Sequence, residues 1–464
     1  MSKLPLAGDF PENDDKAWLA LANKALKGAD FGNTLISHSR DGVEIKPLYT
    51  RADEPDADRA GAPGAAPFIR GFRATAGEPP WHIRQLHATT GPEETNAAIL
   101  EDLEGGATAI ALQIAAPGQC GLKLSSVDDL NRALDGVALD LAGVWLEAGH
   151  NAAKAASALQ QVWSIRGIGD DDAIGGFGAD PFGVMARTGG HPLSLEQALG
   201  EMATLASRTH DRFRKVTAVL VDARPYHGGG GSEAQELGCL CATMAAYLRA
   251  MESEGLAPKD GLAQMEFTLA CDTDLFANIA KLRAARALVS RIADVSDACE
   301  ALPGVRLHAM TSFRMFSRHD PYVNILRTTI ASAAAIFGGA DSLSVLPFTY
   351  VLGQPDAFAR RIARNIQIIL LEESSLGAVT DPAGGSWYVE SLTQELAEKA
   401  WELFQTIESQ GGMADALAKG TIQSMLANMA DERARDVALG NQGLTGVSSF
   451  PDLDEARVEA EPHP

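Results

Sequence analysis

Short apolar runs separated by longer helical segments form the dominant pattern of this chain from about Gly105 onwards. A parallel sheet with crossover helices produces this pattern, because its strands are buried on both faces and a helix returns the chain between them. We predict eight strands, over residues 108–115 (TAIALQIA), 136–142 (GVALDLA), 173–179 (AIGGFGA), 216–222 (VTAVLVD), 265–271 (MEFTLAC), 305–311 (VRLHAMT), 341–347 (DSLSVLP) and, more weakly, 377–381 (GAVTD).

Eight is the number of strands in a (β/α)8 barrel. Right-handed crossovers would close such a series into a ring as readily as they would build an open doubly wound sheet, so the pattern alone leaves both architectures open. Helical segments such as NAAKAASALQQVW and LFANIAKLRAARALVSRIADV lie between the runs. The fold class predicted from the pattern is therefore α/β.

The ends of the chain have a different composition. Residues 14–28 (DDKAWLALANKALKG) predict a helix, residues 43–48 a short strand, and the Ala-, Pro- and Asp-rich stretch 51–67 an extended linker. After Trp387 the sequence becomes helical and ends in the tail EARVEAEPHP. We therefore predict an arm and linker over 1–70, a barrel domain over 71–390, and a helical extension and tail over 391–464.

Composition excludes several classes of function. The 464 residues include 39 Lys and Arg against 61 Asp and Glu, a net charge of −22 that repels nucleic acid and anionic membrane surfaces. The N-terminus lacks an apolar signal region and no run of about 18 apolar residues occurs, so we expect neither export nor membrane insertion but a cytoplasmic location. The five cysteines are scattered and predict no zinc or disulfide framework.

Three long stretches resemble the methylmalonyl-CoA mutase family: residues 320–343 (DPYVNILRTTIASAAAIFGGADSL), 359–374 (ARRIARNIQIILLEES) and 381–401 (DPAGGSWYVESLTQELAEKAW). Residues 279–286 (IAKLRAAR) and 80–85 (PWHIRQ) agree with the same family. The opening stretches 7–31 and 41–55 are more similar to its small (beta) subunits than to its catalytic ones. The resemblance implies a (β/α)8 TIM barrel that binds an acyl-CoA along its axis.

The resemblance also implies a separate C-terminal domain that carries cobalamin on an Asp-x-His-x-x-Gly loop. Residues 443–455 (GLTGVSSFPDLDE) resemble the segment where the family leaves the barrel for that domain, and none of the ten histidines lies in the motif. Some family members take cobalamin from a separately encoded chain. We expect this chain to bind no cofactor itself, with adenosylcobalamin held in the complex by a catalytic large (alpha) subunit.

The family motif before the first strand reads roughly TMYAFRPWTIRQY, and the resemblance implies that its final tyrosine lies beside cobalamin and substrate. The matching stretch here is TAGEPPWHIRQL, which retains Arg84 and Gln85 but has Leu86 in place of the tyrosine. A leucine supplies neither the hydrogen bond nor the shape of a phenol. Arg84 and Gln85 are also consistent with packing residues at the barrel entrance.

Two further positions match the family in part. Catalytic members have an Ile-Gln-Asn-Asp stretch followed by an arginine that pairs with the substrate carboxylate. Here the stretch reads GFGADPFGVMAR, and Arg187 is either that arginine or an ordinary surface residue. The family histidine that bonds the thioester carbonyl corresponds to His227, but Gly228–Gly231 follow it, and we expect four glycines to loosen its geometry. They lack the Gly-Lys-Ser/Thr ending of a phosphate loop.

Three functions remain open. The first is a non-catalytic small subunit of an adenosylcobalamin-dependent methylmalonyl-CoA mutase in propionate metabolism, which stabilises the large subunit as a heterodimer and can form a homodimer when isolated. The second is an active acyl-CoA mutase barrel that uses a separate cobalamin-binding chain. The third is an unrelated barrel enzyme, for which the predicted strand ends offer only Asp180, Asp222 and Asp272, residue types that commonly cap helices.

We favour the first function and predict no catalytic, cofactor-binding or metal-binding residues in this chain. The sequence leaves open which acyl-CoA the complex uses. It also leaves open whether the barrel retains ligand binding through Arg84, Arg187 or His227.

Overall fold

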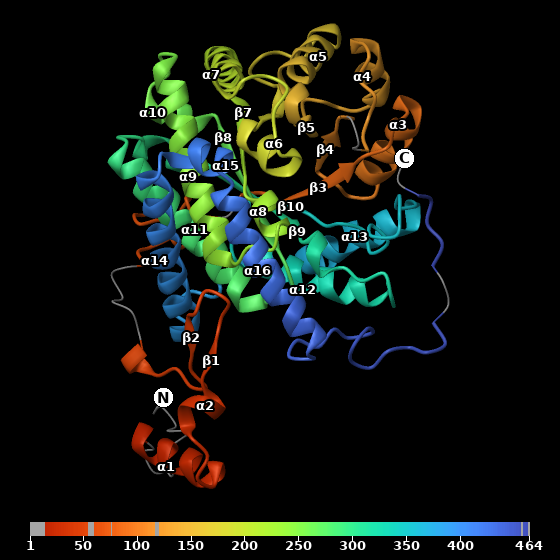
Figure 1. Cartoon of the computed structure of the whole chain (residues 1–464). Coiled ribbons are helices and arrows are strands. Elements are labelled where there is room, and N and C mark those ends of the chain that lie inside the picture. Colours follow the sequence, from red (N-terminus) through yellow and green to blue (C-terminus); the bar gives the residue numbers. More distant parts are fainter. Residues whose placement is uncertain (1–13, 54–59, 76, 117–119, 456–457, 463–464) are drawn as a thin grey trace, which may run out of the picture.

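The fold is a closed (β/α)8 barrel, as predicted. The structure, a computed structural model, describes residues 14–53, 60–75, 77–116, 120–455 and 458–462. Eight parallel strands form a ring in the order β10-β3-β4-β5-β6-β7-β8-β9, with helices around it (Figure 1). The strands are β3 (His82–His87), β4 (Ala109–Gln113), β5 (Gly143–Glu147), β6 (Ile174–Ala179), β7 (Lys215–Asp222), β8 (Met265–Cys271), β9 (Arg306–Thr311) and β10 (Ser342–Ser344).

The ring closes between the last strand and the first. Ser342 of β10 is paired with His82 of β3, and Leu343 with Ile83. On its other side β10 is paired with β9. The pattern of the sequence left an open sheet possible, and this parallel pairing of β10 with β3 excludes it.

Two of the eight predicted strands are wrong. Residues 136–142 form turns, in which the backbone amides of Leu141 and Ala142 both donate to the carbonyl oxygen of Ala138. Val137 and Leu139 are buried. The alternation of apolar residues therefore reflects buried side chains in a turn, without backbone pairing to a neighbouring strand. The strand β5 begins directly afterwards. Residues 377–381 are also not a strand. The 3-10 helix η7 (Leu376–Ala378) overlaps their first two residues, and Val379 is exposed.

The prediction missed β5 and β3, and because β3 is the first strand of the barrel, the barrel begins well before Gly105. Polar residues interrupt the apolar pattern of β3. One of them, Arg84, is only 3% exposed, because its guanidinium pairs with Glu266 of β8 inside the barrel. A charged residue can occupy a strand interior when a partner of opposite charge is buried with it.

The helices on the outside of the barrel follow the strands in alternation. They are α3 (Pro92–Glu104), α4 (Val127–Ala133), α5 (Ala152–Ile165), α6 (Pro181–Thr188), α7 (Leu195–Arg212), α8 (Arg224–Gly228), α9 (Glu233–Ser253), α10 (Pro258–Ala263), α11 (Leu275–Val295), α12 (Val323–Phe337) and α13 (Ala357–Ile368). The short elements η3 (Gly149–Asn151), η4 (Cys299–Gly304), η5 (Phe313–Met315) and η6 (Ile369–Glu373) complete the connections.

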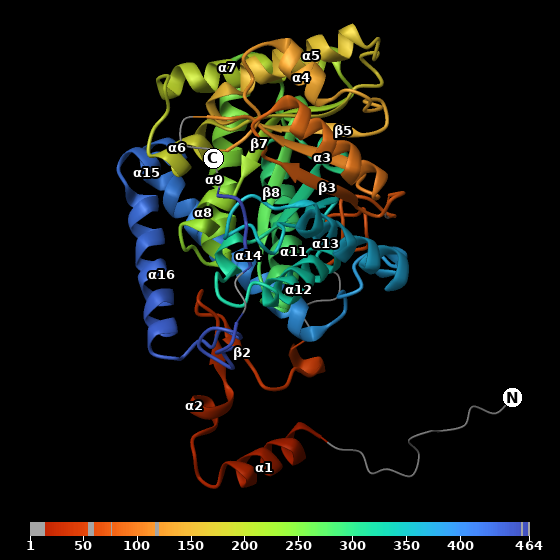
Figure 2. The same ribbon diagram turned by 90° about the vertical axis from the view of Figure 1, so that its right-hand side faces the viewer.

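The C-terminal helices are packed onto the barrel. They are α14 (Trp387–Ser409), α15 (Gly412–Ala418) and α16 (Thr421–Ala438). The α14 helix lies against α9 and α11, and position 390, the predicted end of the barrel domain, falls inside it. Figure 2 shows α15 and α16 beside α8 and α9.

The N-terminal arm projects away from the barrel (Figures 1 and 2). It contains α1 (Asp15–Leu26), which confirms the predicted helix, then α2 (Phe31–Leu35) and a hairpin of β1 (Ser37–His38) and β2 (Glu44–Ile45). Neither α1 nor α2 has a buried residue. The predicted linker contains η1 (Arg51–Asp53), and its residues 54–59 lie outside the described residues. Across the described part of the chain, no helix combines the length and apolarity that crossing a membrane requires.

Candidate functional site

A cavity of about 1050 Å³ lies at the carboxyl ends of the barrel strands. Barrel enzymes have their active sites at this end, because the loops after the strands converge there. Four of the residues that the sequence singled out line it, namely Leu86, Arg187, Asp222 and His227. Arg224, Ser312 and Arg314 line it as well.

Arg84 does not reach this cavity as a free cation. Its Nη1 and Nη2 atoms donate to Oε1 and Oε2 of Glu266 at 2.6 and 3.0 Å, and its guanidinium carbon lies 4.0 Å from the ring centroid of Trp145. All three side chains lie in the interior of the barrel. Arg84 is therefore part of the barrel packing, which was one of the two interpretations left open, and Gln85 beside it is buried as well.

Arg187 lies at the cavity, but protein carboxylates already surround it. Its Nη1 donates to Asp222 Oδ2 at 2.8 Å, and its Nη2 lies 3.7 Å from Asp180 Oδ2. Burial alone would raise the pKa of Asp222, but Arg224 and Arg187 hold that pKa below its ordinary value. Asp222 is therefore a buried carboxylate that is already bound to Arg187.

Arg224 completes this ion-pair network. Its Nε and Nη2 atoms donate to the two oxygens of Asp222 at 2.8 and 2.9 Å, and its Nη1 donates to Glu147 Oε1 at 3.0 Å. Asp180 caps α6 by accepting from the backbone amide of Gly183, as expected for a single aspartate at a strand end. Burial raises the pKa of Asp180 to about 6, although Arg187 opposes the shift.

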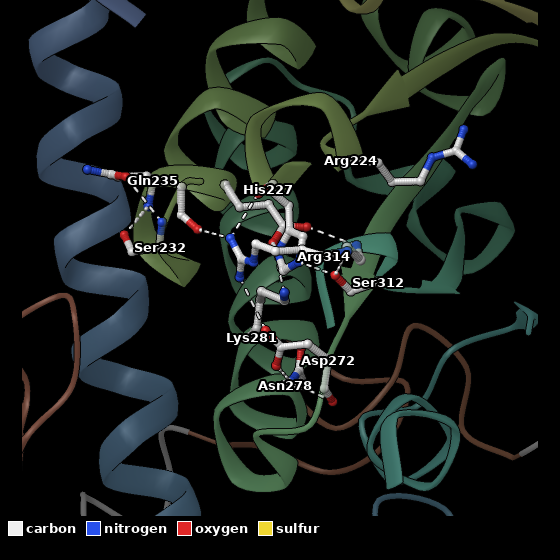
Figure 3. A network of polar contacts seen from close by, with 12 residues as sticks. Arg224, His227, Ser232, Gln235, Asp272, Asn278, Lys281, Ser312 and Arg314 are labelled. Carbon is white, nitrogen blue, oxygen red and sulfur yellow. Dashed lines mark hydrogen bonds and ion pairs between the residues drawn. The ribbon is translucent and has the colours of Figure 1, made fainter. Parts of the chain in front are cut away.

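His227 is held on both sides of its ring (Figure 3). Its Nδ1 lies 3.2 Å from Glu236 Oε2, and its Nε2 lies 2.7 Å from Ser312 Oγ. Glu236 also accepts from Lys281 Nζ at 2.7 Å and from the backbone amide of Ala270 at 2.9 Å. The imidazole is only 2% exposed, although it borders the cavity.

The partners of His227 determine its tautomer. Burial alone would raise the pKa of Glu236, but Lys281 and His227 hold it below its usual value, so Glu236 is a carboxylate that only accepts hydrogen bonds. Nδ1 of His227 therefore carries the ring proton. Burial lowers the pKa of His227 below its ordinary value, so the ring is neutral and Nε2 accepts from the hydroxyl of Ser312.

The glycine loop after His227 is closely packed, and the expectation that it loosens the histidine is wrong. Gly230 has φ +107°, and a Cβ there would lie 2.6 Å from the Cβ of Ala430 on α16. Arg433 of the same helix donates to the carbonyl oxygens of Gly230 and Gly231 at 2.9 and 3.2 Å. The glycines allow α16 to approach the loop, a contact that spans about two hundred residues of sequence.

The sequence analysis missed three residues that hold His227 and the glycine loop after it in place. Lys281 and Glu236 form a buried ion pair, and Arg314 donates to the carbonyl oxygens of His227 and Gly231 at 2.8 and 3.0 Å (Figure 3). Arg314 also pairs with Asp272 at 3.2 Å. Lys281 lies in the stretch 278–286 of α11, which is buried at every residue, and the family resemblance of residues 279–286 was the one available signal. Among the described residues, no group of three or more His, Cys, Asp or Glu side chains is arranged to hold a metal ion.

Comparison with known proteins supplies the remaining evidence. Residues 38–463 match the methylmalonyl-CoA mutase family. The chain is 46% identical to a methylmalonyl-CoA mutase small subunit of Streptomyces virginiae, over 99% of this chain and 74% of that protein. It is 36% identical to the small subunit of Propionibacterium freudenreichii subsp. shermanii, over 99% and 72%. It is 31% identical to a methylmalonyl-CoA mutase of Cereibacter sphaeroides, over 96% and 65%.

Proposed function

Because this chain belongs to the methylmalonyl-CoA mutase family, we propose that it is a non-catalytic small (beta) subunit that stabilises a catalytic large (alpha) subunit. The relatives named small subunits imply a large partner. The projecting α1 supports this role, because an isolated helix of about 12 residues is only marginally stable in water and α1 has no buried residue of its own. The heterodimer, its role in propionate metabolism and its cytoplasmic location stay predictions.

The observation that carries the proposal is the pairing of the cations at the cavity. Arg187 and Arg224 both bind Asp222, and Arg314 binds Asp272. A substrate carboxylate would have to displace a buried protein carboxylate from these arginines, which leaves that carboxylate without its partner. The three arginines therefore stabilise the loops of the barrel mouth without offering a site to an anionic acyl group.

The state of His227 supports the same conclusion. A thioester carbonyl oxygen needs a hydrogen-bond donor, and the neutral ring of His227 presents an acceptor at Nε2 that already bonds Ser312. The ring could donate there only if it were protonated or changed its tautomer. Burial of the ring, Arg314 and Lys281 oppose protonation, and the other tautomer would turn an unprotonated Nδ1 toward the carboxylate of Glu236.

The barrel axis is also filled. The Arg84–Glu266 pair and Trp145 occupy the interior below the cavity, where the family resemblance expects the acyl-CoA to pass. We propose that adenosylcobalamin stays with the large subunit, because the cavity does not fit that group. Leu86 donates no hydrogen bond at the position of the family tyrosine, and both ring nitrogens of His227 are engaged.

One alternative keeps specific support. An active acyl-CoA mutase barrel with a separate cobalamin-binding chain would use the cavity of about 1050 Å³ and the retained His227, which Glu236 orients. The unrelated-enzyme alternative has less support, because Lys281, which lies near Asp272, is fully buried against Glu236.

Turnover of methylmalonyl-CoA by the reconstituted complex separates these functions. We expect His227→Ala and His227→Asn in this chain to leave the turnover of the complex within twofold of wild type. Replacing the matching histidine of the large subunit should abolish turnover. Loss of turnover in both His227 variants, with the complex still assembled, would instead establish the active-mutase alternative.

The stabilising role has its own measurement. We expect the large subunit to lose activity at 37 °C more slowly when this chain is present, and the two chains to co-purify in equal amounts. Stable obligate pairs bury more than about 2,000 Å². Independent migration of the two chains on size-exclusion chromatography at micromolar concentration would refute the proposal.

A further inference from the structure

The interior of the barrel contains a second, much smaller cavity. Its volume is about 20 Å³, against about 1050 Å³ for the cavity at the barrel mouth, and Glu147, Gly178, Leu220 and Arg224 line both. A buried site needs roughly 10–15 Å³ to admit one water molecule. The small cavity therefore has room for a single water molecule or a monatomic ion.

Three buried nitrogen atoms belong to residues that line this small cavity and have no hydrogen-bond partner among the described residues. They are Nε of Arg84 on β3, Nε1 of Trp145 on β5 and Nε2 of His308 on β9. The three residues are only 3%, 7% and 2% exposed. A buried polar atom that forms no hydrogen bond destabilises the fold, so three such atoms around one cavity indicate a shared guest.

The three side chains lie close to one another. The guanidinium carbon of Arg84 is 4.0 Å from the ring centroid of Trp145. Burial, together with the charges of Arg84 and Arg224, lowers the pKa of His308 well below its ordinary value. The imidazole of His308 is therefore neutral, and only one of its two nitrogen atoms carries a proton.

The chemistry of these nitrogen atoms defines what the guest must offer. Arg84 Nε and Trp145 Nε1 can only donate, so the guest must accept two hydrogen bonds. The role of His308 Nε2 is open, because the Nδ1 of that ring lies 2.8 Å from Ser342 Oγ, and a hydroxyl can donate or accept. A water molecule accepts two hydrogen bonds and donates the third, whereas a halide can only accept.

The charges near the small cavity are already balanced, which argues against an anion. Both carboxylate oxygens of Glu266 bind Arg84, and Arg224 is bound by Asp222 and Glu147. A halide would add an uncompensated negative charge to the barrel interior, and burying an unpaired charge costs far more than burying a neutral molecule that forms hydrogen bonds.

We propose that a single ordered water molecule binds inside the barrel between Arg84, Trp145 and His308. Its oxygen accepts from Arg84 Nε and Trp145 Nε1, and one of its hydrogens is donated to His308 Nε2. Three hydrogen bonds are the usual number for a buried water molecule. The site determines the tautomer of His308, since Nδ1 must then carry the ring proton and donate to Ser342 Oγ. The inference does not depend on the proposed function, because the site lies wholly within this chain.

The water has a structural consequence for the barrel. In the ring order, β3, β5 and β9 are not neighbours, so backbone pairing does not join any two of them directly. A water molecule bound to one side chain from each of these strands is a cross-link through the interior of the ring. It adds to the Arg84–Glu266 pair in closing the barrel axis below the mouth.

A high-resolution crystal structure of the full chain tests the site directly. We expect one round peak of electron density within about 3.2 Å of all three nitrogen atoms. In a second crystal soaked in sodium bromide, we expect no anomalous bromine signal at this position. The absence of a peak, or hydrogen bonds formed directly among the three side chains, would overturn the water site. A bromine signal would show that the guest is an anion and would also overturn it.

Trp145→Phe removes one donor from the site and retains an aromatic ring. We expect the electron-density peak to lose at least half of its occupancy. Trp163→Phe is the matched control, because Trp163 Nε1 is also buried without a partner in the described part of the chain, but Trp163 does not line the small cavity. The control should retain the full peak. Equal occupancy in the two variants would mean that Trp145 does not hold the water.

The tautomer of His308 gives an independent measurement on the wild-type chain. A long-range proton–nitrogen NMR spectrum of the chain with 15N-labelled histidine shows which ring nitrogen carries the proton, and the His308 signal is assigned by its loss in His308→Gln. We expect the proton on Nδ1, with Nε2 unprotonated, and no change when sodium bromide is added. A proton on Nε2 would contradict the proposal, because Nε2 could then not accept from the water.

Discussion

The guanidinium of Arg84 on β3 and the carboxylate of Glu266 on β8 are joined by two hydrogen bonds inside the barrel. Both side chains are almost completely buried. Removing one partner of such a pair leaves an uncompensated charge in a low-dielectric interior, whereas replacing both by apolar residues removes that cost.

Glu266→Ala is therefore expected to destabilise the chain by about 3–5 kcal/mol. The double variant Arg84→Met/Glu266→Leu should lose clearly less stability than the single variant. The measurement is the free energy of unfolding in urea. Arg291→Ala, which removes an exposed pair with Asp294, is the control and should cost less than about 1 kcal/mol. Equal losses for the single and double variants would contradict the argument.

Gly230→Ala is expected to loosen the contact between the glycine loop and α16. The backbone there has φ +107°, and the added Cβ would meet Ala430. We expect a loss of about 2 kcal/mol and faster hydrogen exchange in α16. Gly190→Ala is the matched control, because a Cβ at Gly190 meets no atom within 4 Å. If the rate of hydrogen exchange in α16 did not change, Gly230 would not be needed for the close approach of α16 to the loop.

The stability of this chain should depend on pH through Glu233. Burial raises the pKa of Glu233 to about 7; Lys281 opposes the shift, and Asp272 and Asp41 add to it. The ordinary pKa is 4.5, so between pH 4.5 and 7 the folded chain holds a proton that the unfolded chain releases. The free energy of unfolding attributable to Glu233 therefore falls as pH rises through this window, by about 3 kcal/mol.

Glu233→Gln should remove that pH dependence. The difference in unfolding free energy between variant and wild type is measured at several pH values, with the exposed Glu254→Gln as control. We expect the variant to gain stability relative to wild type as pH rises from 4.5 to 7, and the difference to be constant above pH 7. A difference that does not change over this range would mean that Glu233 is ionised throughout.

Leu86→Tyr should not confer mutase activity on this chain. The substitution restores the phenol at the cavity, but the arginines there are still bound to Asp222, and His227 still presents a hydrogen-bond acceptor at Nε2. Groups that act as a unit are not restored one at a time. The assay is turnover of methylmalonyl-CoA with this chain and a separate cobalamin-binding chain, with wild type as control. Turnover above the wild-type background would favour the active-mutase alternative.

The sequence predicted six of the eight strands and missed β3 and β5, the second because the predicted run 136–142 ends one residue before it. The prediction for 265–271 coincides with β8, because every residue of that strand is buried. The strand β3 was missed because its buried arginine depends on Glu266, 182 residues later in the chain. A pattern read over ten residues contains no information about such a partner.

The same limit applies to the site. Arg187, Leu86 and His227 were located from the sequence, and the structure brings all three to one cavity. The groups that decide their chemistry were not found. Ser312 is 85 residues from His227, and Arg433 is 203 residues from Gly230. Their contacts depend on the closure of the ring and on the position of α16, neither of which follows from local periodicity.

The shortness of β10 has a consequence for how the ring fluctuates. Two residue pairs join β10 to β3 and two join β5 to β6, whereas six join β8 to β9. Side chains reinforce the β10–β3 seam, since Ser344 Oγ donates to the carbonyl oxygen of Arg84 at 2.8 Å and Gln367 Nε2 donates to that of Leu343 at 3.2 Å. Transient opening begins where the fewest backbone hydrogen bonds must break. The barrel should therefore open transiently at the β10–β3 and β5–β6 seams, and opening at the first admits water to the Arg84–Glu266 pair while the β8–β9 pairing stays closed.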